Sequence, residues 1–327
     1  MNEQLKQMAD DMLEKFNLID KGFLWEHQLS KHFVALLLTQ SNQAVNIDAL
    51  KRAIDVVKEN TKWYSNFRGT YRFILAGLMV QDGDGFEGGF NRVLMAESAM
   101  KLAGFKQGMH MPIAAYTLSK VADEESPQVL AQRAFGYYND MKANHPWITS
   151  TDDYAMSVLL AKNSVSLERI EEVYRGLSQN GFYKGNELQR LSHILALSTR
   201  TPSELVEDCT LLKKRLKDEK LNLSATYYAS LGLMTHIQFE NPLSLNDCIE
   251  LSKGLMSYKK FKWLGKGMNV LLASALVSNL WITESSQTEA NRALVGITIE
   301  SLIAAQTAAL IAATSAAAAA SSAAATS

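Results

Sequence analysis

The chain has 327 residues, of which 47% are hydrophobic and 20% are charged, as is ordinary for a globular protein. Its 33 basic and 34 acidic residues leave a formal net charge of -1, so electrostatics gives no support to nucleic-acid binding. No segment reads as a membrane span, and the charged, amphipathic start is unlike a signal peptide. We therefore expect a cytoplasmic protein.

Residues 1–42 predict an N-terminal helical hairpin. Its first helix carries Leu5, Met8, Met12 and Phe16 at spacings of three or four residues, which is the pattern of an amphipathic helix. Its second helix, around WEHQLSKHFVALLLTQ, becomes strongly apolar toward its end. Because the terminal units of stacked helical arrays need a cap, we assign this hairpin as a capping domain.

Residues 43–285 predict a domain of about six similar helical hairpins. Each copy has an amphipathic helix, a polar link with a bulky anchor residue, and a second helix rich in Ala and Leu. The anchors, which follow one another at spacings of 42, 42, 35, 39 and 40 residues, are Trp63, Phe105, Trp147, Phe182, Leu221 and Phe261. A period near 40 residues with two helices per copy is typical of an α-solenoid or of a closed α/α toroid. No strand pattern is present, so we predict an all-α fold.

The third copy, MKANHPWITSTDDYAMSVLLAKN, is the clearest. Ser150 and Asp153 have the spacing of a capping box, and Asp152 adds negative charge to the same predicted helix start. Between the first two copies, the stretch QDGDGFEGGF over residues 81–90 predicts a flexible connection. The two cysteines, Cys209 and Cys248, belong to no metal or redox motif and are expected to be buried free thiols.

Residues 286–327 form a third region, which becomes almost pure Ala and Ser. Because Ala is the best helix former, we expect a helix through about Ala313. Its small side chains would allow close packing either against the last hairpin or against a second copy of the chain, so a homo-oligomer contact through this helix is one of two expectations.

Residues with ligand-binding chemistry lie in or just before the predicted second helices, and the candidate set is Arg68, His110, Asp152, Asp153, Glu187, His193 and Lys266. In a closed toroid the starts of these helices converge, and two carboxylates with a histidine could do acid–base chemistry or hold a metal. The alternative is local: Asp152 and Asp153 cap their own helix, and Arg68 caps carbonyls of its own hinge. No dedicated metal or cofactor motif is present, so we predict neither.

The anchors, the WITSTDD link, the NELQRLSHILALS helix and the Ala-rich end resemble an uncharacterised all-α family of low-GC Gram-positive bacteria. That family is catalogued as a domain of unknown function. The resemblance covers nearly the whole chain and implies a bacterial cytosolic protein, but it brings no activity with it.

Two functions remain open. An open array would present a concave surface that binds a protein or peptide, as a scaffold does. A closed toroid would instead form a central pocket for a small molecule, as a binder or a metal-dependent enzyme. The two differ in geometry: in the closed form the first and last hairpins touch, and a pocket contains His110 and Asp152.

Overall fold

The computed structural model describes the whole chain except residues 2, 84, 123–125, 241–242 and 285–327. The described part is all-helical, with fifteen α-helices, three short 3-10 helices and no strand. The predicted all-α class is therefore confirmed. The predicted helix and Ala/Ser-rich tail over 286–327 lie outside the described residues.

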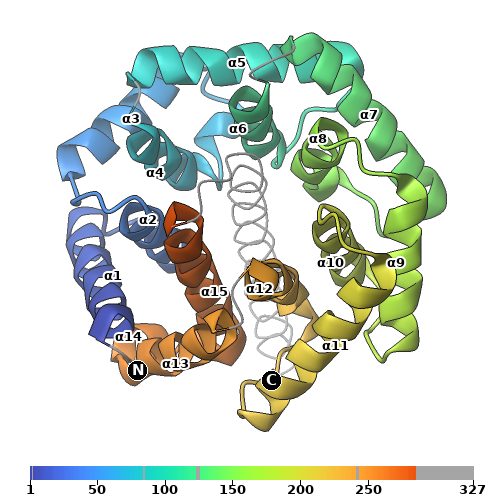
Figure 1. Cartoon of the computed structure of the whole chain (residues 1–327). Coiled ribbons are helices and arrows are strands. Elements are labelled where there is room, and N and C mark those ends of the chain that lie inside the picture. The colour runs from blue at the N-terminus through green and yellow to red at the C-terminus, as the bar shows by residue number, and fades with distance from the viewer. Residues whose placement is uncertain (2, 84, 123–125, 241–242, 285–327) are drawn as a thin grey trace, which may run out of the picture.

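Seven helical hairpins are arranged as a ring with an outer and an inner layer (Figure 1). The outer helices are α1 (Glu3–Gly22), α3 (Ile47–Glu59), α5 (Phe86–Ala103), α7 (Pro127–Asn144), α9 (Leu167–Gln179), α11 (Pro202–Asp218) and α13 (Ser244–Ser257). The inner helices are α2 (Gln28–Gln40), α4 (Arg72–Asp82), α6 (Met111–Val121), α8 (Tyr154–Lys162), α10 (Asn186–Ala196), α12 (Tyr228–Glu240) and α15 (Gly265–Glu284). The short helices are η1 (Asn66–Arg68), η2 (Thr151–Asp153), η3 (Ala225–Tyr227) and α14 (Lys259–Lys262).

The two layers follow from the hydrophobic patterns of their helices. In α3 the buried side chains Leu50, Ala53, Ile54 and Val57 recur at helical spacing, so one face packs inward and the other meets water. In α8 every residue from Tyr154 to Ala161 is buried. A helix that is apolar all round requires cover on every side, and the inner layer provides it. Cys209 on α11 and Cys248 on α13 are buried free thiols, as predicted.

The connection between α4 and α5 is shorter than the sequence predicts. Gly83 ends α4 in a left-handed conformation with φ of 68°, and α5 already begins at Phe86. The flexible connection predicted over 81–90 is therefore wrong at both ends, because α4 runs through Asp82 and α5 begins at Phe86. Glycine is tolerated in the first turn, and the helix is fixed there by Phe90, which is fully buried and packs edge-on against Phe67.

The ring is closed by contacts between the first and last hairpins, where α1 packs on α13 and α2 packs on α15. At this junction the rings of Phe16 and His32 stack with centroids 3.9 Å apart, and Phe261 packs against both. The imidazole Nε2 of His32 also makes a hydrogen bond of 3.1 Å with the carbonyl oxygen of Lys260. The hairpin predicted to be a terminal cap therefore contacts both of its neighbours in a ring.

Asp20 holds the polar side of this junction. Its carboxylate accepts hydrogen bonds from Lys31 at 2.9 Å, from Gln28 at 2.9 Å and from Lys260 at 3.0 Å. Lys31 is 1% exposed, so its ammonium depends on this carboxylate for a counter-charge. Chiefly through the hydrogen bond from Lys31, the pKa of Asp20 lies well below its ordinary value.

The links that lead from each outer helix to its inner helix all lie at one end of the ring, which we call the link rim. The link rim comprises residues 23–27, 60–71, 104–110, 145–153, 180–185, 219–227 and 258–264. Each link touches the next link or the next inner helix. Examples are Glu26 with Arg72, Asn66 with Gln107, and the backbone amide of Lys106 with the hydroxyl of Tyr154. The inner helices therefore all begin at the link rim.

Within the part of the chain that the structure describes, no helix is both long enough and apolar enough to cross a membrane.

The Asp20 junction predicts a specific loss of stability in Asp20→Asn. Asparagine keeps the size but removes the charge that Lys31 requires, and we expect the free energy of unfolding to fall by about 2 kcal/mol at pH 7. Because the pKa of Asp20 is lowered in the fold, its stabilisation is present above about pH 4 and is lost as acid protonates it. Urea denaturation of both proteins should show a difference that shrinks below about pH 4.

The matched control is Asp55→Asn. Asp55 pairs with Lys58 at 2.9 Å within α3, and both side chains are about half exposed. This pair should make no measurable difference to the denaturation midpoint. Equal effects of the two substitutions would contradict a special role for Asp20.

Candidate functional site

The site begins at the two adjacent carboxylates of η2, which precede α8. The backbone amide of Ser150 donates to Asp153 Oδ2 at 2.9 Å, and the hydroxyl of Ser150 donates to Asp152 Oδ1 at 2.5 Å. Ser150 and Asp153 form the predicted capping box. The two carboxylates nevertheless face different surroundings, and their chemistry differs as a result.

Asp152 reaches across to the next inner helix. Its Oδ2 accepts hydrogen bonds from Arg190 at 2.7 Å and from Asn186 at 2.9 Å, both on α10. Burial acts to raise the pKa of Asp152, but the charge of Arg190 and the hydrogen bonds from Ser150 and Asn186 outweigh it and hold the pKa below its ordinary value. Asp152 is therefore ionised at neutral pH. Its side chain is 14% exposed and that of Arg190 is 8% exposed, so the pair lies at the edge of the core.

Asp153 points into the protein instead. Its side chain is buried, and its Oδ1 has no hydrogen-bond partner among the described residues. Burial, together with the neighbouring charge of Asp152, raises the pKa of Asp153 to about 7. The pKa of Asp152 is thus lowered while that of its neighbour Asp153 is raised. Asp153 is the group that can exchange a proton near neutral pH.

Helix α10 supplies two more buried polar atoms without a described partner, Asn186 Oδ1 and His193 Nδ1. Asn186, Arg190 and His193 follow one another at spacings of four and three residues, so they share one face of α10. Burial, and after it the charge of Arg190, lowers the pKa of His193 to about 3. Its imidazole is therefore neutral at physiological pH. We call Asp152, Asp153, Asn186, Arg190 and His193 the Asp152 cluster.

His110 extends this arrangement toward the previous inner helices. It precedes α6, and its Nδ1 lies 3.3 Å from the hydroxyl of Tyr71, which precedes α4. Burial lowers the pKa of His110, while the charge of Asp152 acts to raise it. The structure thus couples His110 and Asp153 electrostatically to Asp152 at the starts of α6 and α8. His193 lies further along α10 and senses the charge of Arg190.

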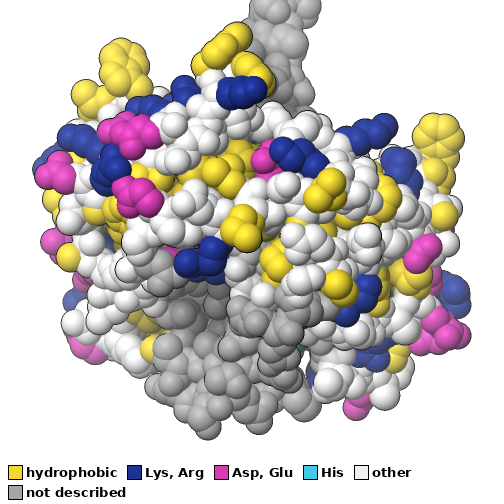
Figure 2. All heavy atoms as spheres, turned by 90° about the horizontal axis from the view of Figure 1, so that it is seen from above, with side chains coloured by type: hydrophobic (Ala, Val, Ile, Leu, Met, Phe, Trp, Pro, Cys, Tyr) yellow, Lys and Arg dark blue, Asp and Glu magenta, His cyan; other side chains and the backbone are white. Residues whose placement is uncertain are grey.

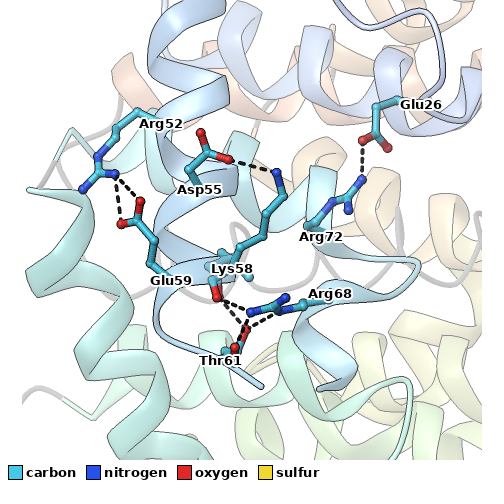
Figure 3. Close-up of polar contacts among 9 residues, drawn as sticks. Glu26, Arg52, Asp55, Lys58, Glu59, Thr61, Arg68 and Arg72 are labelled. Atoms are coloured by element: carbon cyan, nitrogen blue, oxygen red, sulfur yellow. Dashed lines mark hydrogen bonds and ion pairs between the residues drawn. The ribbon is translucent and has the colours of Figure 1, made fainter. Parts of the chain in front are cut away.

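Arg68 is placed elsewhere. Its Nε donates to the hydroxyl of Thr61 at 3.1 Å, and its Nη2 donates to the backbone carbonyls of Lys58 and Thr61 (Figure 3). Arg68 therefore joins η1 to the end of α3. It caps carbonyls of its own hinge, which is the alternative to ligand binding that the sequence offered. The arginine of this hinge that pairs with another link is Arg72, whose guanidinium donates to Glu26 at 2.7 Å (Figure 3).

The other two candidates lie further round the link rim. Glu187 is half-buried in the first turn of α10, and its charge acts to raise the pKa of Tyr228 on the next inner helix. Lys266 is exposed at the start of α15. Neither makes a hydrogen bond or an ion pair with the Asp152 cluster within the described residues.

Sequence reasoning missed Arg190, the residue that joins α10 to Asp152. In NELQRLSHILALS an isolated arginine reads as an ordinary surface residue. The available signal was the spacing of Asn186, Arg190 and His193, which places three polar side chains on one face of the helix. A second buried contact was also missed, in which Gln189 Nε2 donates to the hydroxyl of Thr149 at 3.0 Å.

The raised pKa of Asp153 predicts how its removal changes pH dependence. An acid whose pKa is higher in the fold than in the unfolded chain favours the folded state while protonated, so its stabilising effect is lost as pH rises through about 7. Between pH 5 and pH 8 this group should lower the free energy of unfolding by about 2 kcal/mol. Asp153→Asn cannot ionise, and urea denaturation at both pH values should show that this decrease has disappeared. A variant with the same pH dependence as the parent chain would contradict a buried, titrating Asp153.

Comparison with known proteins places the chain among bacterial relatives. The family model described as "Protein of unknown function (DUF4003)" matches residues 15–308. The chain is also 27% identical over 312 residues to "Uncharacterized protein YeaA" of Bacillus subtilis (strain 168), an alignment that covers 86% of this chain and 93% of that protein. No solved structure matches. The family resemblance seen in the sequence is confirmed, and because the family model covers most of its length, the chain belongs to the DUF4003 family.

Proposed function

We propose that this protein binds a small polar molecule at the Asp152 cluster, where α8 and α10 begin at the link rim. The observation that carries the proposal is a set of buried polar atoms without a described partner on η2 and α10: Asp153 Oδ1 and Asn186 Oδ1, with His193 Nδ1 about two turns further along α10. A buried polar atom that forms no hydrogen bond costs about 1–3 kcal/mol, so three such atoms on two adjoining elements call for a physical reason. A bound ligand supplies one.

The identity of these atoms indicates the chemistry of the ligand. Asn186 Nδ2 donates to Asp152, so its Oδ1 is fixed as an acceptor. Asp153 Oδ1 accepts when the group is ionised, and Nδ1 of a neutral histidine accepts in one of its two tautomers. A ligand for this cluster would therefore donate hydrogen bonds, as the hydroxyl groups of a polyol or the N–H groups of an amine do.

Closure of the ring supports this function over an open binding groove. A concave groove for an extended peptide requires an array whose ends stay apart, whereas here α1 contacts α13 and α2 contacts α15. In a closed ring the starts of the inner helices converge on one end, which suits a compact ligand better than an extended one. The same cluster has the chemistry to transfer a proton, since Asp153 titrates near neutral pH beside an ionised Asp152.

Native mass spectrometry of the full chain, purified gently from its natural host, tests this proposal. We expect a bound small molecule as an added mass, and we expect Asn186→Ala to lose it. The control is Asn180→Ala, because Asn180 lies in the link that leads to α10 and its side-chain amide donates to the carbonyl of Gly176 at 2.9 Å. That variant should retain the added mass.

The stability of Asn186→Ala separates a binding role from a structural one. Asn186→Ala loses the hydrogen bond to Asp152, which is unfavourable, but it also removes a buried acceptor that has no partner, which is favourable. The two effects offset each other, so the free energy of unfolding should change by less than about 1 kcal/mol. A parent chain with no added mass, or an added mass that survives in Asn186→Ala, would contradict the proposal.

A further inference from the structure

The exposed aromatic side chains of this protein gather on the link rim. Six aromatic residues are exposed in the described part of the chain, and all six lie in these links: Trp25, Trp63, Tyr64, Trp147, Tyr183 and Trp263. Trp25 is 99% exposed and Trp147 is 96% exposed, so neither packs against its own fold. Single exposed hydrophobic residues are common, but two almost fully exposed tryptophans together with four further exposed aromatic residues at one end of a molecule mark an interaction surface.

The link rim also carries unpaired positive charge. Six exposed lysines of the links form no ion pair within the described residues: Lys62, Lys106, Lys184, Lys220, Lys259 and Lys262. The carboxylates of the same links are neutralised or buried. Glu26 pairs with Arg72, Asp152 pairs with Arg190, and Glu219 pairs with Lys253 at 2.7 Å. The charge available to a partner is therefore positive.

The two ends of the ring differ in this respect. Among the described links that lead from inner to outer helices, only Leu243 is an exposed large hydrophobic residue. Other exposed hydrophobic residues, such as Met95 and Val129, lie on the outer helices. Figure 2 shows the side of the ring, where exposed hydrophobic side chains lie among Lys, Arg, Asp and Glu side chains.

We propose that the link rim docks on the surface of a bilayer that contains anionic lipids. Tryptophan and tyrosine are the side chains that favour the boundary between headgroups and acyl chains, and lysines nearby are attracted to anionic headgroups. The aromatic residues lie on five separate links around the ring, so they can touch a broad, deformable surface at several points at once. A single-stranded nucleic acid would require a continuous basic groove along which bases stack.

This inference goes beyond the proposed function and does not depend on it. It concerns residues that project from the links, whereas the Asp152 cluster lies in the edge of the core.

Co-sedimentation of the full chain with vesicles provides the test. We expect binding to vesicles of phosphatidylcholine mixed with phosphatidylglycerol and little binding to phosphatidylcholine alone, with binding that weakens as salt is raised. The double variant Trp25→Ser/Trp147→Ser should lower the partition coefficient at least about tenfold, because each tryptophan loses its apolar contact with the interface. The control Met95→Ser/Val129→Ser removes exposed hydrophobic residues of the outer helices and should leave binding unchanged.

Charge is tested in the same way. Lys259→Gln/Lys262→Gln should lower binding to the anionic vesicles several-fold. Its control, Lys6→Gln/Lys214→Gln, changes exposed lysines of α1 and α11 outside the link rim and should have no effect on binding. Thermal unfolding of each variant checks that it folds.

The proposal is overturned if the parent chain does not sediment with anionic vesicles, or if the link-rim variants bind as well as their controls. It is also overturned if the tryptophan substitutions leave vesicle binding intact and instead break up oligomers in sedimentation velocity. That outcome would make the link rim an interface between copies of the chain.

Discussion

The architecture depends on the junction between the first and last hairpins. There a buried lysine, Lys31, has Asp20 as its counter-charge, and Lys260 from the other end of the chain reaches the same carboxylate. A buried ammonium left without this carboxylate would be strongly unfavourable, so Asp20 fixes the first hairpin, and the same carboxylate offers Lys260 of the last hairpin a partner across the junction. Because outer and inner helices alternate along the chain, every inner helix runs in the same direction and starts at the link rim, and closure places the first and last of them side by side.

That geometry explains where polar chemistry can exist in this protein. Helix α8 is buried on every side from Tyr154 to Ala161, and a charge there would need a partner in the core. The starts of the inner helices are different, because free backbone amides favour carboxylates there and the next helix offers a partner. Asp152 at the start of α8 and Arg190 one turn into α10 are the clearest example. The link rim thus combines an inner polar cluster with an outer set of exposed aromatic and cationic side chains.

Much of the fold is legible in the sequence because helix signals are local. The segment NIDALKRAIDVVKEN predicts a helix, and α3 spans Ile47–Glu59. The starts that carry His110, Asp152 and Asp153 are equally local, so the sequence points to them as site candidates, and their role in binding stays a prediction. Closure was not predictable, since Asp20 and Lys260 are 240 residues apart and neither carries a distinctive motif. Arg190 was missed for the same reason: its value arises only from its distant partner.

Zero-length carbodiimide cross-linking of the monomeric protein tests ring closure most directly. Lys260 Nζ lies 3.0 Å from Asp20 Oδ2, whereas Lys253 Nζ lies 2.7 Å from Glu219 Oε2 between neighbouring hairpins and serves as the internal control. A closed ring predicts that peptide mapping finds both amide links in the monomer fraction. If the Lys253–Glu219 link forms but the Lys260–Asp20 link is absent, or appears only in dimers, the ring is not closed as described.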